Sequence, residues 1–337
     1  MKLQFYVARR VVLLIPVLLG VTFITFALTR ILPGNPIDRI AGPFVSAERK
    51  AEISREYGLD EPFYVQYATY VEDLFHGDFG RSLVSGVPIS DELSNRFAAT
   101  FELTTAALLI ALVVAVPLGV VAALKKNTFM DGIARIVAIG GVSVPVFWSG
   151  LMLSFLLFYR WGIAPPPIGR IDPRIGAPDH VTGLYTVDSV LTWNWGAFVS
   201  AVKTLWLPAS VMGFSVMAPI MRLVRQGMIE ALEAPSTTAL KALGARPASI
   251  VLRHALKNAL MPVVTMLAIV YGYLLGGSVL VEFIFSWPGM GLYAFNSIAA
   301  TDFPAVQGFI LYATTMYVVV FLLLDLVYLA LDPRVKY

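Results

Sequence analysis

The sequence contains no cysteine and unusually little charge. Because none of the 337 residues is Cys, disulfides, thiolate nucleophiles, Cys-ligated metals and iron–sulfur clusters are excluded. Only 14% of the residues are charged and 58% are hydrophobic, whereas a soluble domain usually has about a quarter charged residues. Together with a mean hydropathy of +0.75, this composition predicts a polytopic membrane protein.

Side chains suited to catalysis are scarce as well. An intramembrane protease needs a Ser/His pair, paired aspartates or an HExxH zinc helix inside its spans, but the three histidines, His76, His180 and His254, all lie outside the long apolar stretches. No GxxxxGK[ST] sequence occurs, so the chain has no P-loop with which to bind ATP. We therefore expect no catalytic residue, metal site or cofactor in this chain.

Six apolar stretches are long enough to span a bilayer, which takes roughly 20 helical residues. They are Val11–Leu28, Ala98–Leu124, Ile133–Tyr159, Leu205–Met221, Leu260–Phe283 and Gly308–Leu331. The first follows a basic MKLQFYVARR start, as in a signal peptide, but it is long for a signal region and no small-x-small cleavage site follows it. We interpret it as a retained first helix.

The basic and acidic residues lie in different loops. With the N-terminus inside, fourteen of the 25 Lys and Arg residues fall in inner segments or their flanks, while eleven Asp and Glu residues fall in the first outer loop. This bias predicts that both termini are cytoplasmic, and it explains the net charge of +3 without nucleic acid. The predicted order is a terminus at 1–10, a helix at 11–28, an outer loop at 29–97, a five-helix core at 98–331 and a terminus at 332–337.

Both long outer loops carry local signals. In the loop 29–97, residues 46–59 are predicted to form a polar helix, and FYVQYATYVEDLFHG (63–77) an amphipathic helix. Neither is able to span, so we expect both at the outer interface. The apolar face of the second helix is predicted to hold Tyr64, Tyr67, Val71 and Leu74. The loop 161–203, with APPPIGR and DPRIGAPDH, is predicted to be irregular.

The ionisable residues near the membrane lie close to the ends of the apolar stretches. Glu102 and Glu282 lie near outer ends and Asp325 near an inner end. Proton relays and ion-coupled carriers keep such groups partnered near the midplane. We interpret all three as interfacial or helix-terminus charges, which disfavours a secondary transporter.

The segment between the fourth and fifth stretches combines helical patterning with basic charge. Apolar residues up to Leu243 follow one side of a short helix, and Gly244 is placed to cap it in a left-handed conformation. Arg246 and Pro247 then turn the chain, and ASIVLRHALKNAL begins a second helix. An ordinary loop with snorkelling cations does not explain two short helices and an elbow. Because such helices are marginal alone, we expect them to pack on another protein surface or on the span ends.

This segment resembles the EAA loop of permease subunits from ATP-binding cassette importers, and the resemblance covers almost the whole chain. Gly244, RHALKNALMP (253–262) and the following VVT resemble the peptide/nickel branch of that family. The long first outer loop resembles that of the first of two unequal permeases in a dipeptide or oligopeptide importer. Further motifs are RILPGNP (30–36), YGLDEPFYVQY (57–67), HGDFGRSL (76–83), TFELTTAALLIALVVAVPLGVVAAL (100–124), SVPVFWSGL (143–151), EFIFSWPGMG (282–291), DFPAVQG (302–308) and the closing LDPRVKY.

The resemblance implies an all-α type I permease fold with six transmembrane helices in the prokaryotic inner membrane, forming half of a translocation pathway. It implies as partners a second homologous permease, two ATPase subunits that bind ATP and Mg, an extracytoplasmic solute-binding protein and the lipid bilayer, but not nucleic acid. Hydrolysis is left to the ATPases, whose closure acts on a coupling helix at about 229–246. The implied ATPase-coupling residues are Glu230, Glu233, Thr238, Ala239, Leu240, Gly244, Ala245, Arg246, Arg253 and His254.

One departure from the family pattern concerns the EAA triplet. Its positions are Thr238, Ala239 and Leu240, so the acidic residue of the family is absent. Glu230 and Glu233 lie one or two turns earlier and are the alternative docking carboxylates. Whether either contacts the ATPase stays open at this point.

Polar and aromatic residues in or beside the spans are candidates for the pathway or its gate. Hydroxyl groups in spans often bond neighbouring helices instead, and FSWPGMG also fits an aromatic belt at the interface. Peptide is the expected cargo, with nickel chelate and oligosaccharide as alternatives for the same machine. An ion-coupled carrier, a channel or an insertion or scaffold protein are alternatives of other classes. The candidates are Ser143, Ser149, Thr265, Tyr271, Ser278, Glu282, Phe285 and Trp287.

Overall fold

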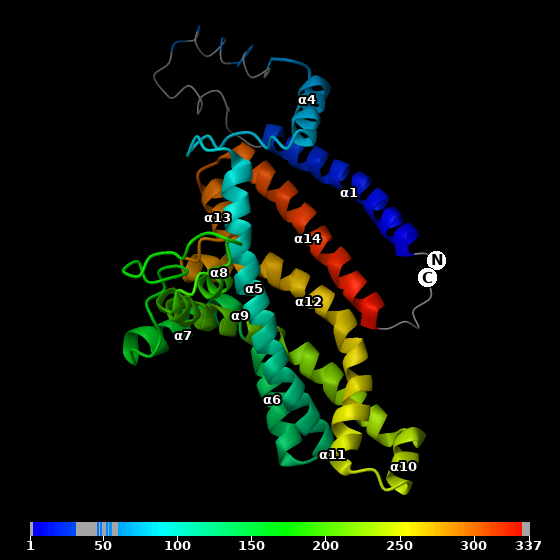
Figure 1. Cartoon of the computed structure of the whole chain (residues 1–337). Coiled ribbons are helices and arrows are strands. Elements are labelled where there is room, and N and C mark those ends of the chain that lie inside the picture. The colour runs from blue at the N-terminus through cyan, green and yellow to red at the C-terminus, as the bar shows by residue number, and fades with distance from the viewer. Residues whose placement is uncertain are drawn as a thin grey trace. The chain divides into compact units, whose positions relative to one another are not determined.

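The computed structural model describes residues 3–31, 46, 48, 52, 54, 55 and 60–331. Throughout these residues the regular elements are helices, apart from an isolated bridge between Arg81 and Pro88 (Figure 1). The predicted all-α fold is therefore confirmed. The described residues leave out most of the polar helix predicted at 46–59, most of RILPGNP, all but the first residue of the closing LDPRVKY, and the side chain of Asp325.

The chain divides into two compact units. The first comprises Met1–Phe97, Leu292–Leu322 and Lys336–Tyr337, and the second comprises Ala98–Gly291 and Leu323–Val335. Two short segments, η1 and η2, are π-helical. In chain order the elements are α1 (Leu3–Ile31), α4 (Phe63–Phe75), α5 (Ile89–Leu124), α6 (Phe129–Ser143), α7 (Val146–Ser154), η1 (Phe155–Arg160), α8 (Tyr185–Leu191), α9 (Trp195–Glu233), α10 (Pro235–Ala242), α11 (Pro247–Ser249), η2 (Ile250–Ala255), α12 (Leu256–Ile284), α13 (Met290–Ala299) and α14 (Phe303–Leu331).

Four helical stretches among the described residues are long and apolar enough to cross a membrane: Ile89–Leu124, Trp195–Glu233, Pro247–Ile284 and Phe303–Leu323. A further candidate is broken, because Phe129–Gly141 and Val146–Arg160 meet at an angle of 98°. The apolar stretch Ile133–Tyr159 is therefore bent and not one straight helix, and the span predicted there stays a prediction. Pro145 keeps Val144 extended, with ψ of 124°. Since α1 contains a shorter apolar stretch, Ile15–Leu28, the count of six spans stays a prediction.

Two helices extend well beyond the apolar stretches that predicted them. α5 begins at Ile89 instead of Ala98, because Ile89 and Leu93 are both fully buried on one side of a turn whose other residues are polar. α9 begins at Trp195, where Asn194 accepts a hydrogen bond from the backbone N–H of Ala197 at 3.0 Å. The irregular loop predicted up to Lys203 is wrong in its last part, which contains α8 and the start of α9.

In the first unit, α1 and α4 contact each other through aromatic side chains. Phe26 of α1 stacks on Tyr70 of α4 with ring centroids 5.4 Å apart, and it meets Phe63 edge-on at 5.3 Å. Such pairs contribute about 0.5–1.5 kcal/mol beyond their buried area. The helix predicted here is present, but Tyr64 does not belong to its packed face because it is 73% exposed.

Two of the sequence motifs meet in the first unit. The carboxylate of Asp302, at the start of DFPAVQG, is 2% exposed. It accepts hydrogen bonds from Oγ of Ser82 at 2.6 Å and from the backbone N–H groups of Leu83 at 3.2 Å and Val84 at 3.3 Å. The turn that follows HGDFGRSL is thereby held to the start of α14.

α9 is the central helix of the second unit and packs against α6, α7, α8 and α12 (Figure 1), and it also crosses α5. Glycines permit the close crossings. A Cβ on Gly213 would lie 2.6 Å from the carbonyl oxygen of Ala107 in α5, and one on Gly227 would lie 2.9 Å from Cα of Ala259 in α12. Small residues at such crossings let helices associate in lipid, where no hydrophobic driving force acts between them.

Candidate functional site

The short helix predicted before Gly244 is present as α10, but it begins later than expected. Glu230 belongs to α9, which ends at Glu233, and the helix is interrupted at Ala234, whose ψ is 145°. Pro235 follows as the first residue of α10, and its ring disfavours a helical conformation in the residue before it. The predicted coupling helix at 229–246 is therefore two elements. Gly244 ends α10 with φ of +76°, as the predicted left-handed cap requires.

The second predicted short helix is the first part of a long one. Pro247 begins α11, and the helical stretch continues through η2 and α12 to Ile284. Proline suits the first turn of a helix, because a backbone N–H at that position would have no acceptor within the helix. Arg253 and His254 lie in η2, a π-helical insertion, and such insertions are frequent at functional sites.

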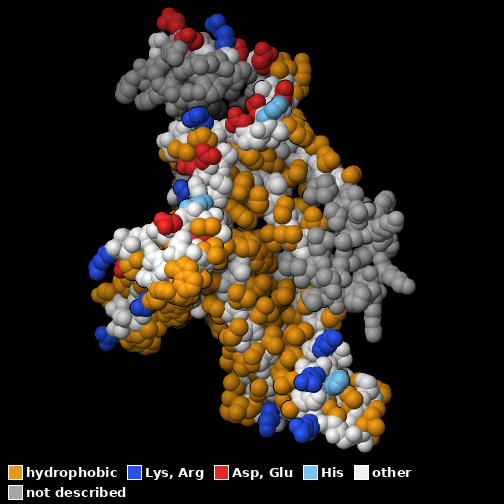
Figure 2. All heavy atoms as spheres, in the orientation of Figure 1, with side chains coloured by type: hydrophobic (Ala, Val, Ile, Leu, Met, Phe, Trp, Pro, Cys, Tyr) orange, Lys and Arg blue, Asp and Glu red, His pale blue; other side chains and the backbone are white. Residues whose placement is uncertain are grey.

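The predicted coupling residues from Thr238 to His254 contribute to an exposed, basic surface around α10 and α11. Thr238, Ala239, Arg246, Arg253 and His254 are exposed, whereas Leu240 and Ala245 are half-buried. Figure 2 shows Lys, Arg and His side chains gathered around this segment, with no acidic side chain in view beside them. An apolar side chain adds to the surface, since Leu243 is 83% exposed. This helix end therefore exposes both cationic and apolar side chains.

The two alternative docking carboxylates already have partners within the chain. Oε1 of Glu233 lies 2.8 Å from Nζ of Lys126, in the turn between α5 and α6. Oε1 of Glu230 accepts a hydrogen bond from Nε2 of Gln226 at 2.7 Å. All four side chains sit in α9 or beside its end, so neither carboxylate lies on α10. The surface of α10 itself is therefore without a carboxylate.

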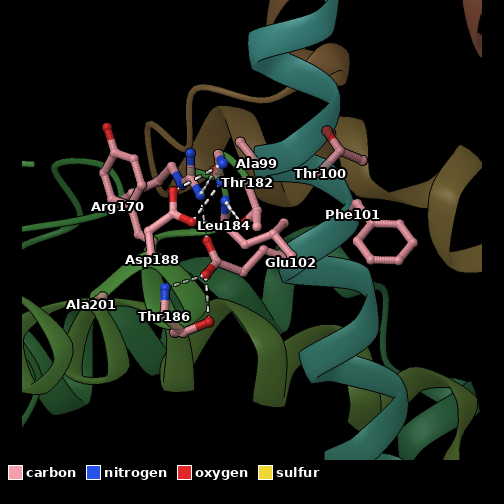
Figure 3. A network of polar contacts seen from close by, with 12 residues as sticks. Ala99, Thr100, Phe101, Glu102, Arg170, Thr182, Leu184, Thr186, Asp188 and Ala201 are labelled. Atoms are coloured by element: carbon pink, nitrogen blue, oxygen red, sulfur yellow. Dashed lines mark hydrogen bonds and ion pairs between the residues drawn. The ribbon is translucent and has the colours of Figure 1, made fainter. Parts of the chain in front are cut away.

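A buried ion pair, which the sequence did not indicate, lies in the second unit (Figure 3). Nη2 of Arg170 lies 2.6 Å from Oε2 of Glu102 in α5, and it also donates to the carbonyl oxygen of Gly183 at 2.7 Å. The side chains are 6% and 5% exposed. The guanidinium carbon lies 3.7 Å from the ring centre of Tyr185, which adds a cation–π interaction. The interpretation of Glu102 as an interfacial charge is wrong.

Glu102 also anchors the start of α8. Its Oε1 accepts hydrogen bonds from the backbone N–H and from Oγ1 of Thr186, both at 2.7 Å. Oγ1 of Thr204 in α9 donates to the carbonyl oxygen of Arg170 in the preceding loop at 2.5 Å. The segment between η1 and α9 is therefore fastened to α5 and α9 by buried polar contacts, although its Pro and Gly content suggested irregular structure.

Asp188 of α8 holds the turn before its own helix (Figure 3). Its carboxylate accepts from the backbone N–H groups of Val181, Thr182 and Gly183 at 3.3, 2.7 and 2.9 Å, and from Oγ1 of Thr182 at 2.6 Å. Burial opposes ionisation of Asp188, but these hydrogen bonds outweigh it and lower the pKa of the carboxyl below its ordinary value.

The motif EFIFSWPGMG folds around a buried carboxylate. Glu282 is fully buried and accepts from Oγ1 of Thr100 at 2.7 Å, and that hydroxyl accepts from the backbone N–H of Met290 at 2.8 Å. A Cβ on Gly289 would lie 2.5 Å from the Glu282 carboxylate, so glycine is required there. Glu282 therefore lies near the end of α12, in agreement with the helix-terminus alternative, but it is buried in the protein and is not a solvated interfacial charge. Phe285 and Trp287 are 4% and 1% exposed, so the aromatic-belt alternative is also wrong.

The remaining pathway candidates do not form one surface. Tyr271 is buried on α12 and its hydroxyl lies 2.8 Å from Oγ1 of Thr105 in α5. Ser278 is fully buried and donates to the carbonyl oxygen of Leu275 in its own helix. Thr265 and Ser143 are exposed, and Ser149 is half-buried. Tyr271 and Ser278 therefore make hydrogen bonds within the chain, and the pathway role of all five residues stays a prediction.

The sequence is similar along its length to transport proteins. The family model described as binding-protein-dependent transport system inner membrane component matches residues 115–337, and the N-terminal model of that component matches residues 2–104. The dipeptide transport system permease protein DppB of Alkalihalophilus pseudofirmus is 40% identical over 332 residues, covering 98% of this chain and 99% of that protein. The probable D,D-dipeptide transport system permease protein DdpB of Escherichia coli is 42% identical over 322 residues, or 96% and 94%. The glutathione transport system permease protein GsiC of Salmonella choleraesuis is 31% identical over 332 residues, or 98% and 99%.

Proposed function

The chain belongs to the family of binding-protein-dependent transport system inner membrane components, and on this premise we propose that it is a permease subunit of an ATP-driven peptide importer. It forms half of a translocation pathway for dipeptides or oligopeptides. The observation that carries the proposal is the similarity, over 96% or more of the chain, to permeases named for dipeptide transport. The membrane-spanning helices supply the pathway, and the chain contributes no P-loop of its own.

The finer assignments follow from this role. ATP and Mg are bound and ATP is hydrolysed in two separate ATPase subunits, which dock on the cationic and apolar surface of α10 and α11. A second permease completes the pathway, and an extracytoplasmic binding protein delivers the peptide. Both chain termini lie in the cytoplasm together with α10, because the Lys and Arg residues concentrate on that side.

The docking surface supports this division of labour. On α10 and in the segment that follows it up to residue 258, the exposed ionisable side chains are basic, with Lys241, Arg246 and Arg253 among them. A partner that fits this surface presents acidic or neutral groups together with an apolar recess for Leu243. Because Thr238 stands where the family has an acidic residue, the docking contact here does not depend on a carboxylate in α10.

The proposal is tested by a matched pair of variants at the cap of α10. Gly244 has open space around it, so a side chain there meets no neighbour within the chain. Gly244→Asp brings a negative charge to a surface whose partner is expected to be acidic or neutral, whereas Gly244→Asn adds the same bulk without charge, and both residues tolerate φ above zero better than most.

We expect Gly244→Asp to insert normally in the membrane and to lose ATP-dependent dipeptide uptake in proteoliposomes that contain the co-expressed partner subunits. Gly244→Asn is expected to retain most of that uptake. Normal uptake by Gly244→Asp counts against docking at this surface. If the wild-type chain never brings down an ATPase, and uptake persists without ATP but with an ion gradient, the importer function is refuted.

A further inference from the structure

Asp131 and Arg225 form a two-pronged ion pair that joins α6 to α9 in the second unit. Nε of Arg225 donates to Oδ1 of Asp131 and Nη2 donates to Oδ2, each at 2.8 Å. The Asp131 side chain is fully buried and that of Arg225 is 19% exposed. Two parallel charge-assisted hydrogen bonds fix the mutual orientation of two planar groups, as one bond does not. The pair therefore sets how α6 lies against α9 at this point.

The same carboxylate also holds the turn between α5 and α6. Oδ2 of Asp131 accepts from the backbone N–H of Asn127 at 3.1 Å, and Asn127 has φ of +62°. A left-handed residue of this kind lets the chain reverse between two helices. Lys126 in this turn reaches Glu233 at the end of α9, but both side chains are largely exposed, so that pair is weak. Asp131 is thus the buried link between this turn and α9.

Arg225 lies on the part of α9 that leads into α10. α10 is held to the end of α9 by Thr237, which is 3% exposed and donates to the carbonyl oxygen of Ala231 at 2.6 Å. Beside Arg225, α9 approaches α5 so closely that a Cβ on Gly119 would lie 2.8 Å from Cβ of Val224. A displacement of α10 therefore reaches α5 and α6 through consecutive close contacts.

Stability alone is a weak reason for such a pair. Removing two charges from water costs about as much as their attraction returns, and apolar residues of similar volume often stabilise a core as well or better. What a buried pair provides in addition is a fixed geometry between the elements that carry it. Here those elements are α9, which leads into α10, and α6, which follows α5 in the chain.

We propose that Asp131 and Arg225 are positioning residues that transmit the movement of α10 to the turn between α5 and α6, and so couple ATPase closure to movement of the membrane-spanning helices. The inference rests on the proposed function. Toward its other end α5 carries Thr100 and Glu102, which bond Glu282 and Arg170. A movement of the α6 end of α5 therefore also displaces the end of α12 and the loop before α8, which are bonded to Thr100 and Glu102.

The test measures dipeptide imported per ATP hydrolysed by the complete complex in proteoliposomes. The double variant Asp131→Asn with Arg225→Gln removes both charges together, so that neither is left buried and unpaired. We expect it to assemble with the ATPases and to hydrolyse ATP, while dipeptide imported per ATP falls about 2- to 30-fold, the range for residues that modulate coupling. Arg225→Lys keeps the charge but loses the two-pronged geometry, and we expect a smaller fall in the same ratio.

Arg135→Gln is the matched control. Arg135 approaches the same carboxylate at 3.5 Å, but it lies on α6 itself and its side chain is 55% exposed, so its loss should leave the ratio unchanged. A wild-type ratio in both the double variant and Arg225→Lys overturns the proposal, and if the double variant does not assemble, Arg225→Lys decides alone. A wild-type complex that imports no dipeptide with ATP contradicts the proposed function instead, so the two failures are distinguishable.

Discussion

The hydroxyl of Thr100 donates a 2.7 Å hydrogen bond to the carboxylate of Glu282, and both residues are buried. The contact joins the start of TFELTTAA to the start of EFIFSWPGMG, two motifs 182 residues apart. A second contact lies beside it, since Nε1 of Trp287 donates to the carbonyl oxygen of Ala99 at 2.9 Å. The two motifs are therefore one structural feature that fixes the end of α12 against α5.

Thr100→Val should destabilise the chain more than the same change at Thr105. The Thr100 hydroxyl serves both Glu282 and the backbone N–H of Met290, and a buried group that loses its partner costs about 1–3 kcal/mol, more when it is charged. Thr105 bonds only the neutral hydroxyl of Tyr271, a contact worth about 0.5–1.5 kcal/mol. Thermal unfolding midpoints in detergent compare the two, and equal midpoints would contradict a special role for Thr100.

Replacing only one partner of the ion pair between Glu102 and Arg170 should lower the stability of the chain more than replacing both. Both side chains are almost fully buried, so Glu102→Gln or Arg170→Met leaves an unpaired charge, at a cost of about 3–5 kcal/mol. The double variant leaves none and should unfold nearer to the wild type. A double-mutant cycle on unfolding midpoints measures the difference. If the two single effects simply add, the side chains do not act as a pair.

Helices and their caps were the parts of the structure that the sequence predicted well. The apolar stretches mark α5, α9, α12 and α14, and Gly244 marks the end of α10, because hydropathy and left-handed caps are local signals. Helix starts were missed where the first turns are amphipathic, as at Ile89, since only one side of such a turn is apolar. Pro235 causes the break at Ala234. The prediction gave more weight to the helical periodicity on either side and therefore continued the helix through this position.

The polar contacts could not be predicted because they join distant residues. Glu102 and Arg170 are 68 residues apart, Asp131 and Arg225 are 94 apart, and Ser82 and Asp302 are 220 apart. A single sequence shows that Glu102 lies in an apolar stretch but not what charge meets it. The interfacial interpretation failed for this reason, since a buried carboxylate with an unseen partner has the same local sequence as a solvated one.

Gly227→Ala should destabilise the chain, whereas Gly276→Ala should not. The new Cβ at position 227 would lie 2.9 Å from Cα of Ala259, so α9 and α12 must separate, and overpacking of this kind costs about 1–3 kcal/mol. At Gly276 of α12 no atom lies within 4 Å of the new Cβ, and alanine favours a helix over glycine by up to about 1 kcal/mol. Unfolding midpoints of the isolated chain in detergent should fall for the first variant only. A fall of the same size in both would show that flexibility, and not the crossing, requires the glycines.

The backbone amides in the turn that Asp188 holds should lose their protection from hydrogen exchange only in acid. The pKa of this carboxyl is lowered in the folded chain, and an unfolded Asp has a pKa of about 3.9. A lowered folded pKa means that the ionised carboxylate contributes its stability fully above about pH 4 and loses it as the pH falls from there through the folded pKa.

Hydrogen exchange of the amides of Val181, Thr182 and Gly183, corrected for the intrinsic dependence of exchange on pH, should therefore show constant protection from pH 8 to 5 and a decline below about pH 4. Asp188→Asn should lower the protection at neutral pH and abolish the acid-dependent decline, because the neutral amide accepts through one oxygen only. His180→Gln is the control for the imidazole, whose Nε2 lies 3.4 Å from where a Cβ on Gly183 would be. A decline that begins well above pH 5 and disappears in His180→Gln would assign the pH dependence of this turn to the imidazole and not to Asp188.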